Sequence, residues 1–471
     1  MWGNAGCLSK TYNEILDKTL SEYPAEQCPR VQLSTKALPK MQNKITSINI
    51  EDIRFPTSLT LDGSDAMNEA PDYSAAYVII QTSGGMEGHG LTFTTGRGNE
   101  LCVAGIKSLS AILIDRDIDG LFNDLGGIWK DLTGDSQLRW VGPEKGVIHL
   151  AAGALMNGLW DLYSKTLRKP LWQVLSEMDP KQTIALIDWT YLRDALDPGA
   201  ALERLQEQQP GRKKRTSQIL KTGYPAYTTS VGWLGYSDEK MRTLCQGALD
   251  QGWTHFKMKV GGDHQDDLRR ASILREMIGP KLKLMMDANQ VWGVDETIKK
   301  MGDLGKYDPW WIEEPTSPDD ILGHARIAKE LAPIKVATGE HCHNAVMFKQ
   351  FLQANAISFL QLDSCRLAGP NEILATLLLA DKFGVPVCPH AGGVGLCEYV
   401  QHISIYDYIA VSGSLENRVL EYVDHLHEHF VDPVKMQDGH YMPPTEPGYS
   451  ITMKQESIKK FRYPDGLAWR E

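Results

Sequence analysis

The sequence contains no run of about 18 apolar residues, the length that a membrane-spanning helix requires. We therefore expect no membrane span and no membrane partner. Residues 1–43 also lack the apolar segment of a secretory signal, and their four acidic residues are unlike the Arg-rich, acid-poor composition of transit peptides. We interpret residues 1–43 as a mobile extension with one short helix around Asn13–Glu22.

Cysteine is sparse: the 471 residues include 8 cysteines, and none forms a C-x-x-C pair. Most of them lie in apolar segments, which predicts buried free thiols in a reducing, intracellular compartment. Four disulfides are the alternative, but a chain of this length needs none to build a core.

Basic residues are outnumbered as well. The 49 Lys and Arg residues against 60 Asp and Glu residues give a net charge of -11. Bulk electrostatics therefore disfavours nucleic acids and anionic membranes as partners. The basic run Arg212–Arg215 is an exception, and we interpret it as part of a solvated helix or loop rather than as a nucleic-acid patch.

The remaining composition, with 42% apolar and 23% charged residues, is that of an ordinary globular protein, and the length allows two or three domains. Strand and helix patterns between residues 44 and 180 predict an α+β domain. Within it, Arg54–Tyr73 is rich in Pro, Ser, Asp and Gly and predicts a long loop of the kind that often forms a lid. The strands are expected at Lys44–Arg54, Ala75–Thr82 and Gly90–Thr95, and the clearest helix at Val147–Leu167.

From Thr228 onward, short apolar runs that end in polar residues alternate with helical stretches. This alternation predicts an α/β fold of parallel βα units, and eight units fit a barrel of the (β/α)8 type whose last helix is altered. A doubly wound sheet is the alternative, but its first strand would usually be followed by G-x-G-x-x-G, which is absent here. The runs are Thr229–Trp233, His255–Val260, Lys283–Ala288, Trp310–Glu314, Lys335–Gly339, Phe359–Leu362, Val385–Cys388 and Val419–Val423.

Polar residues close these runs at intervals of 23 to 31 residues, which is about one βα unit. Because catalytic residues of barrels project from the carboxyl ends of the strands, these side chains should converge on one mouth. The residues are Lys257 and Lys259, Asp287 and Asn289, Glu313 and Glu314, Glu340, Asp363, His390 and Glu421.

Asp287, Glu313 and Glu340 are three carboxylates from adjacent strands. Hard oxygen ligands without Cys or His favour Mg²⁺, with water or substrate completing the octahedron. Three unrelated salt bridges are the alternative interpretation. The pattern therefore predicts a magnesium site at the barrel mouth.

Two groups suited to proton transfer accompany the carboxylates. Lys257 and Lys259 alternate onto one strand face, and their repulsion near a cation should lower a lysine pKa and make a neutral amine base available. Two ordinary surface lysines are the alternative. His390 has Asp363 one βα step earlier, and a carboxylate behind an imidazole fixes its tautomer and raises its pKa.

Two histidine groups invite a zinc interpretation. Zinc sites usually show defined Cys/His spacing with a closing fourth ligand, and no H-E-x-x-H is present. We expect structural or surface roles for His341 and His343, and for His425, His427 and His429.

The sequence resembles the enolase superfamily, whose sites combine a Lys or His base with Mg²⁺. Within it the resemblance is to the mandelate racemase subgroup and most closely to the L-fuconate dehydratase family, over residues 44–471. The matching blocks are "KMKV", "DANQ", "WIEEPTSPDD", "ATGEHCHN", "QLDSCRLAG", "CPHAGGVGLCE", "RFPTS", "DYSAAYV", "QLRWVGPEKGV", "YPAYTTSVGWLGYSD" and "LENRVLEYVDHLHEHF".

The resemblance implies an α/β fold: a (β/α)7β modified TIM barrel over residues 181–429 and an N-terminal α+β capping domain over 44–180, with the segment 430–471 packing back on the cap. It implies that Lys259 is the base, that His390 is the second acid/base with Asp363 behind it, and that Mg²⁺ is held by Asp287, Glu313 and Glu340. Substrate contacts are implied for Gly63, Ser64, Asp65, Tyr73, Lys257, Asn289, Glu340, His390, Ala391, Gly392 and Glu421. Glu416 is a competing choice for the eighth-strand carboxylate.

The implied activity is the Mg²⁺-dependent conversion of the acid sugar L-fuconate to 2-keto-3-deoxy-L-fuconate and water. Another acid-sugar dehydratase, an epimerase that shares the first half-reaction, and a non-enzymatic regulatory protein on the same fold are the alternatives. The resemblance further implies a homo-oligomer and a mitochondrial location, with the cytoplasm as the alternative.

Overall fold

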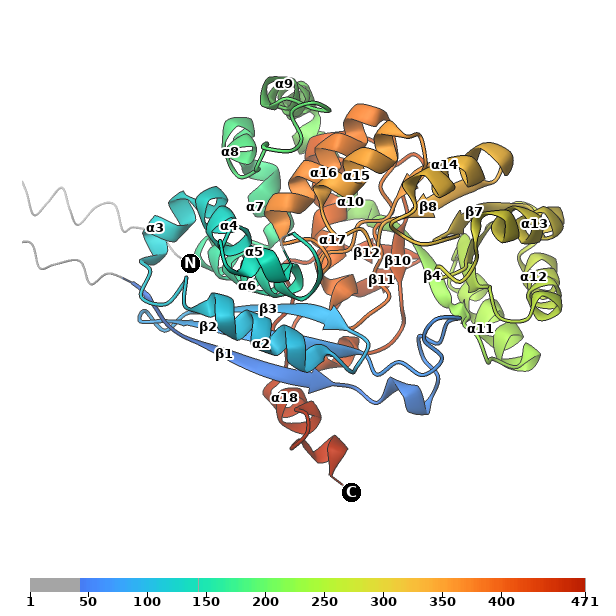
Figure 1. Ribbon diagram of the computed structural model, residues 1–471, viewed down its shortest axis with the longest axis horizontal. Coiled ribbons are helices and arrows are strands. Elements are labelled where there is room, and N and C mark those ends of the chain that lie inside the picture. The colour runs from blue at the N-terminus through green and yellow to red at the C-terminus, as the bar shows by residue number, and fades with distance from the viewer. Residues whose placement is uncertain (1–42, 143, 471) are drawn as a thin grey trace, which may run out of the picture. The chain divides into compact units, whose positions relative to one another are not determined.

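The computed structural model describes residues 43–142 and 144–470 (Figure 1). The short helix expected around Asn13–Glu22 lies outside the described residues. Among those residues, no helix is both long and apolar enough to cross a bilayer. The described residues form one compact unit, so the domain limits expected at 180 and 429 stay predictions.

An antiparallel sheet in the order β1-β2-β3 opens the described chain. The sheet packs on the long helix α6, and Gly90 permits this because a Cβ there would lie 2.3 Å from the Ala154 carbonyl oxygen of α6. The three strands and the helix predicted from the sequence are therefore confirmed, with small shifts at their ends. The bounds are β1 Ile45–Arg54, β2 Ser74–Thr82, β3 Glu87–Thr94, α2 Asn99–Ser110, α3 Ile118–Asn123, α4 Leu125–Thr133, α5 Leu138–Val141, α6 Gly146–Thr166, α7 Leu171–Glu177 and α8 Pro180–Ala185.

A parallel barrel follows, in which β10 returns to pair with β4 and closes the sheet. Seven helices follow the first seven strand positions and none follows the last, which makes the fold a (β/α)7β barrel, as predicted. The strands are β4 Tyr224–Gly232, β5 His255–Lys259, β6 Lys283–Asp287, β7 Pro309–Glu313, β8 Lys335–Thr338, β9 Phe359–Leu360 and β10 Leu420–Tyr422. The helices are α11 Asp238–Asp250, α12 His264–Ile278, α13 Val294–Leu304, α14 Ile321–Glu330, α15 Ala345–Gln353, α16 Pro370–Phe383 and α17 Leu396–Tyr406.

The seventh strand position differs from the prediction. The run Val385–Cys388 forms no regular strand and pairs through a single bridge between Val387 and Leu360. Pro386 interrupts the run and Pro389 follows it directly, and proline lacks the N–H group that a sheet ladder needs. The chain still passes through this gap in the barrel, because Cys388 donates from its backbone N–H to the Leu360 carbonyl at 2.8 Å.

Two helices, α9 Pro198–Gln208 and α10 Arg212–Thr222, lead into the barrel. The basic run therefore begins a helix, as expected. Arg212 donates to the carbonyls of Ser176 and Met178, and Arg215 donates to the carbonyl of Ile409. Part of the run thus binds neighbouring backbone.

The C-terminal segment reaches both parts of the fold. Its strands β11 Lys435–Gln437 and β12 His440–Met442 form a hairpin, and β12 pairs with the start of β4. Farther along, the Tyr77 hydroxyl donates to the Ile451 carbonyl at 3.0 Å and accepts from the Met453 N–H at 2.8 Å. The helix α18 Gln455–Phe461 then contacts β1 (Figure 1).

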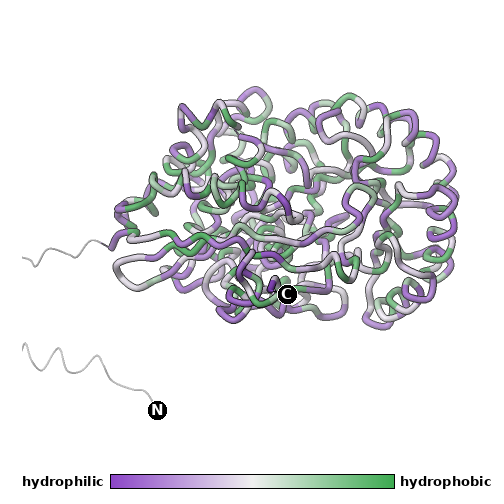
Figure 2. Tube along the Cα trace, turned by 60° about the horizontal axis from the view of Figure 1, so that its bottom comes forward, coloured by the Kyte–Doolittle hydropathy of each residue, from purple (hydrophilic) through white to green (hydrophobic). Residues whose placement is uncertain are grey.

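The barrel interior is apolar below its mouth. A separate buried cluster fills it with Tyr227, Met285, Trp311, Ala337, Phe359, Cys388 and Val419. Strand side chains alternate, so Asp287 and Glu313, two residues beyond Met285 and Trp311, face the same interior one layer higher. Hydrophilic turns of the tube lie mainly along the outer helices (Figure 2). The six cysteines among the described residues are all buried and free, as predicted: Cys102, Cys245, Cys342, Cys365, Cys388 and Cys397.

Candidate active site

The polar residues predicted at the strand ends come together at the barrel mouth. A cavity of about 390 Å³ opens above them, between the barrel and the loop that connects β1 to β2. Its wall includes these predicted residues: Gly63, Asp65, Tyr73, Lys259, Asn289, Glu340, Asp363, His390, Gly392 and Glu421. Others lie beside or beneath the wall: Ser64, Lys257, Asp287, Glu313 and Ala391.

Asp287, Glu313 and Glu340 form a cluster whose ligand atoms all lie within 4.8 Å of one another. Burial, together with repulsion from Asp287, raises the pKa of Glu313 to about 8. Burial and repulsion from Glu314 raise the pKa of Glu340 to about 7. Such pKa values indicate more buried negative charge than the protein's own cations offset. An all-oxygen set with excess negative charge fits a hard divalent cation such as Mg²⁺.

Both lysines contact these carboxylates. The Lys259 Nζ lies 2.6 Å from Asp287 Oδ2, whereas the fully buried Lys257 Nζ lies 2.6 Å from Glu313 Oε1 and 2.7 Å from Glu421 Oε1. Burial lowers the pKa of Lys259, but the combined attraction of the surrounding carboxylates, with Asp287 the strongest, holds that pKa above its usual value. Without a cation, the pKa of Lys259 is raised because carboxylates outnumber the two ammonium groups. The lowered lysine pKa expected beside a cation stays a prediction.

His390 and Asp363 form the expected dyad. His390 Nδ1 lies 2.8 Å from Asp363 Oδ2, and Asp363 Oδ1 accepts the backbone N–H groups of Cys365 and Arg366 at 2.7 Å each. Burial lowers the pKa of His390, but Glu340, Glu421 and Asp363 outweigh burial and raise that pKa to about 10. The structure thus presents an imidazolium acid and the Lys259 side chain to one cavity.

The loop between β1 and β2 folds over the mouth as a compact turn. Gly63 adopts φ +81°, and a Cβ there would lie 2.1 Å from the Tyr73 hydroxyl oxygen, so only glycine allows this contact. Asp65 Oδ1 accepts the N–H groups of Met67 and Asn68 at 2.7 Å. Ser64 is buried, and its hydroxyl donates to the Glu69 carbonyl at 2.8 Å, away from the wall.

The eighth-strand carboxylate at the cavity is Glu421. Its Oε2 accepts the Ala391 N–H at 2.8 Å, and the side chain lies on the wall. Glu416, the competing choice, is exposed outside the barrel mouth. Asn289 lies on the wall as well, and its buried Oδ1 has no hydrogen-bond partner among the described residues.

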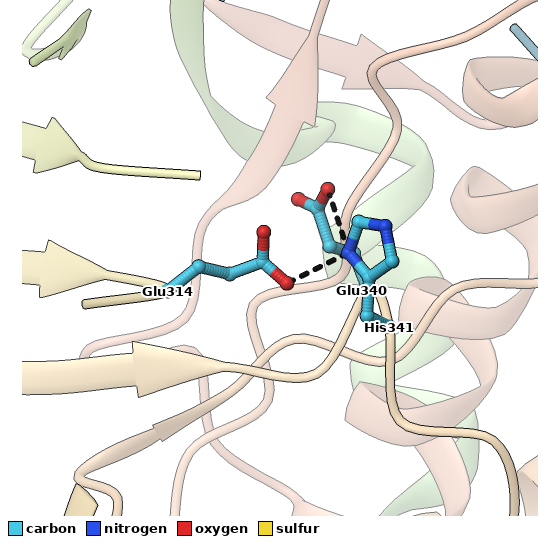
Figure 3. Close-up of side chains that lie close together, drawn as sticks. All are labelled: Glu314, Glu340 and His341. Carbon is cyan, nitrogen blue, oxygen red and sulfur yellow. Dashed lines mark hydrogen bonds and ion pairs between the residues drawn. The ribbon is translucent and has the colours of Figure 1, made fainter. Parts of the chain in front are cut away.

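Sequence reasoning missed a third group at the mouth (Figure 3). His341 Nδ1 lies 2.8 Å from Glu314 Oε1 and 3.4 Å from Glu340 Oε1, and the imidazole lines the cavity. The expectation of a merely structural or surface role for His341 is thus incomplete. Its position directly after Glu340 was the available signal. Arg366, which was not singled out either, lines the same cavity.

The other histidine run fits its predicted structural role. His427 bonds to Glu398 Oε1 and to the Val423 carbonyl, both at 2.7 Å, and His429 stacks on Phe55. These contacts connect the end of the barrel with the N-terminal sheet.

Sequence and structure comparisons find similar proteins over most of the chain. The family described as enolase C-terminal domain-like matches residues 240–457. Human mitochondrial enolase superfamily member 1 is 56% identical over 435 residues, covering 92% of this chain and 98% of the human protein. Its crystal structure matches with a TM-score of 0.90 and covers 91% of this chain and 98% of that one.

Two further similar proteins are named for an enzymatic activity. L-galactonate dehydratase of Hypocrea jecorina is 52% identical over 432 residues, covering 90% of this chain and 96% of that protein. A racemase of Streptomyces coelicolor, crystallised with bound magnesium, is 25% identical with a TM-score of 0.70 and covers 89% of this chain and 99% of that one.

Proposed function

The chain belongs to the enolase superfamily, and from this membership we propose that it converts L-fuconate to 2-keto-3-deoxy-L-fuconate and water, with Mg²⁺ as cofactor. Acid-sugar dehydration is the coarser function that its relatives support. The observation that carries the proposal is the joint presence of Lys259, His390 and the carboxylate cluster at one cavity.

The relatives narrow the class of substrate. One of them is named L-galactonate dehydratase, and L-fuconate differs from L-galactonate only in the hydroxyl on the last carbon. The reacting carbons C2 and C3 are therefore the same in both acids. This shared reacting end supports a six-carbon aldonic acid as the substrate.

The chain's own residues suit both proton transfers of a dehydration. The neutral amine of Lys259, which a cation on Asp287 would favour, would take the proton from C2, while His390 would protonate the hydroxyl that leaves C3. Asp363 holds the imidazole through Nδ1, so Nε2, which lies 3.1 Å from the Gly392 backbone nitrogen, is the nitrogen that would act on the substrate. Asp287, Glu313 and Glu340 would hold Mg²⁺, whose positive charge would stabilise negative charge on the substrate carboxylate.

An epimerase is the second candidate, because two acid/base groups at one cavity can remove and return a proton at C2. Elimination of the C3 hydroxyl, which yields a 2-keto acid, separates the two activities. A non-enzymatic protein on this fold would be expected to have lost a base or a metal carboxylate, and this chain retains all of them.

A screen of acid sugars with Mg²⁺ tests the proposal. We expect 2-keto acid from L-fuconate, with release of the C3 hydroxyl, at a kcat/KM of at least about 10⁴ M⁻¹s⁻¹. Product formation is followed by a 2-keto-acid assay, and C2 exchange is followed by NMR in D₂O. Epimerisation without keto acid would contradict the dehydratase, and keto acid from another sugar acid alone would contradict the substrate.

Glu421 and Glu416 provide a matched pair of variants. Glu421→Gln removes the charge that faces Lys257 and His390, so we expect kcat/KM to fall about 10²-fold or more. Glu416→Gln changes an exposed side chain and should leave kcat/KM within about twofold. Steady-state kinetics and thermal melting of both variants check this, and equal effects would contradict the assignment of Glu421.

Location and assembly are proposals, and the name of a relative supports only the location. We place the protein in the mitochondrion, in line with the name of the human relative, and we propose a homo-oligomer that acts on a small-molecule acid sugar.

A further inference from the structure

His341 holds a fixed position beside the reaction centre. It directly follows Glu340 at the end of β8, and 36% of its side chain is exposed. Its Nδ1 faces the Glu314 carboxylate at 2.8 Å, while Nε2 lies on the opposite edge of the ring, directed away from both carboxylates (Figure 3). Within residues 43–142 and 144–470, Nε2 of His341 makes no hydrogen bond.

Glu314 makes this orientation rigid. Its side chain is fully buried, and its second oxygen, Oε2, accepts from Gln290 Nε2 at 2.9 Å. A buried carboxylate needs such partners, because leaving one unpaired costs several kcal/mol. Gln290 Nε2 also lies 2.7 Å from His341 Nδ1, so the imidazole is held by Nδ1 from two side chains, and Nε2 remains the edge available to a ligand.

Arg366 presents a second free edge on the same wall. Its Nε donates to the Glu340 carbonyl at 3.1 Å, and its backbone N–H donates to Asp363 Oδ1. The terminal nitrogens Nη1 and Nη2 bond to nothing in the described part of the chain, although the residue lines the cavity. A guanidinium with its outer edge free offers donors in a fixed plane.

His341 Nε2 and the terminal nitrogens of Arg366 belong to residues that lie next to Glu340 and Asp363. His341 is joined to Glu340 by the peptide bond, and Arg366 is bonded to both Glu340 and Asp363. Dehydration involves only C1 to C3 of the acid. The part of a sugar acid beyond C3 carries hydroxyl groups, and a hydroxyl can both donate to an imidazole nitrogen and accept from a guanidinium.

We propose that His341 Nε2 and the terminal nitrogens of Arg366 bind the hydroxyl groups beyond C3 of the substrate and so set its chain length. This subsite rests on the proposed dehydratase function and adds two specificity residues to it. A site built to bond a hydroxyl rejects an analogue that lacks it, because the protein's polar groups are then left unpaired.

The test compares substrate length with side-chain removal. The substrates are six-, five- and four-carbon aldonic acids with the same configuration at C2 and C3. The variants are Arg366→Met, which keeps the aliphatic stem, and His341→Asn, whose amide can still donate to Glu314 but ends short of Nε2. We expect each variant to lose about tenfold or more in kcat/KM on the six-carbon acid and progressively less on the shorter acids, because the four-carbon acid keeps only one hydroxyl group beyond C3.

Two controls separate specificity from structure. Arg326→Met removes an exposed guanidinium of α14 and should change neither kcat/KM nor the length preference. Thermal melting with and without Mg²⁺ shows whether each variant keeps the fold and the cation site. Arg366→Lys, which restores a donor, should recover part of the preference for the longer acid.

The opposing outcomes are distinct. An equal loss on all three acids would mean that His341 and Arg366 only support the fold, and would overturn the subsite. A wild-type preference for a dicarboxylic acid that Arg366→Met removes would assign the guanidinium to a second carboxylate and would also overturn it. A wild-type protein that dehydrates none of these acids would overturn the proposed function together with the subsite.

Discussion

Lys259→Ala is expected to reduce the dehydration of L-fuconate by about 10²–10⁴-fold, the range typical for the loss of a general base. The variant should also stop the exchange of the C2 proton with D₂O, because Lys259 is the only lysine on the cavity wall among the described residues. Rapid-quench measurement of keto acid and NMR of C2 exchange check these two losses separately.

The matched control for this prediction is Lys283→Ala. Lys283 begins β6, at the opposite end of the strand from Asp287, and it is exposed. We expect its replacement to leave turnover within about twofold. Normal turnover by a folded Lys259→Ala variant would contradict the assignment of Lys259 as the base.

Removal of Mg²⁺ is expected to abolish turnover and to lower the melting temperature by several degrees, since a ligand that binds only the folded state at 100 times its Kd contributes about 2.7 kcal/mol. The physical reason for the lower melting temperature is the repulsion among the three carboxylates when no cation offsets their charge. Glu340→Gln sharpens the test: burial and repulsion already raise the pKa of Glu340 to about 7.

Neutralising Glu340 relieves repulsion in the metal-free protein. We therefore expect the Glu340→Gln variant to melt no lower than wild type in EDTA, and to gain little from added Mg²⁺. Scanning calorimetry with and without Mg²⁺ measures this, with Glu416→Gln as the control that keeps the wild-type response. A full Mg²⁺ response in Glu340→Gln would exclude Glu340 as a ligand.

The regular part of the fold could be predicted because it depends on local periodicity. The runs at His255–Val260 and Lys283–Ala288 match β5 and β6 within one residue, since apolar runs that end in polar residues report parallel strands directly. The first barrel strand, β4, begins at Tyr224, five residues before the predicted Thr229. The reason is that Pro225, at the start of β4, pairs only with the C-terminal hairpin. That hairpin lies more than 200 residues away.

In the candidate site, too, some features could be predicted from the sequence and others depended on distant residues. Residue types at the strand ends predicted the carboxylate cluster, the Lys259 amine and the His390–Asp363 pair, and the structure brings all of them to one mouth. Spacing alone could not place Lys257, which lies beneath the wall between Glu313 and Glu421. It could not rank Glu421 above Glu416 on geometry either.

The sequence by itself therefore determined the barrel, its cap and the chemical types at its mouth, because each follows from a pattern within one βα unit. Only the tertiary structure decided the charge balance around the lysines, the anchoring of His341 by Glu314 and the free edge of Arg366. These features depend on distances between residues 26 to 164 positions apart, and no local periodicity records them. The physical reason is that pKa values and ligand-facing edges are set by the neighbours that packing supplies.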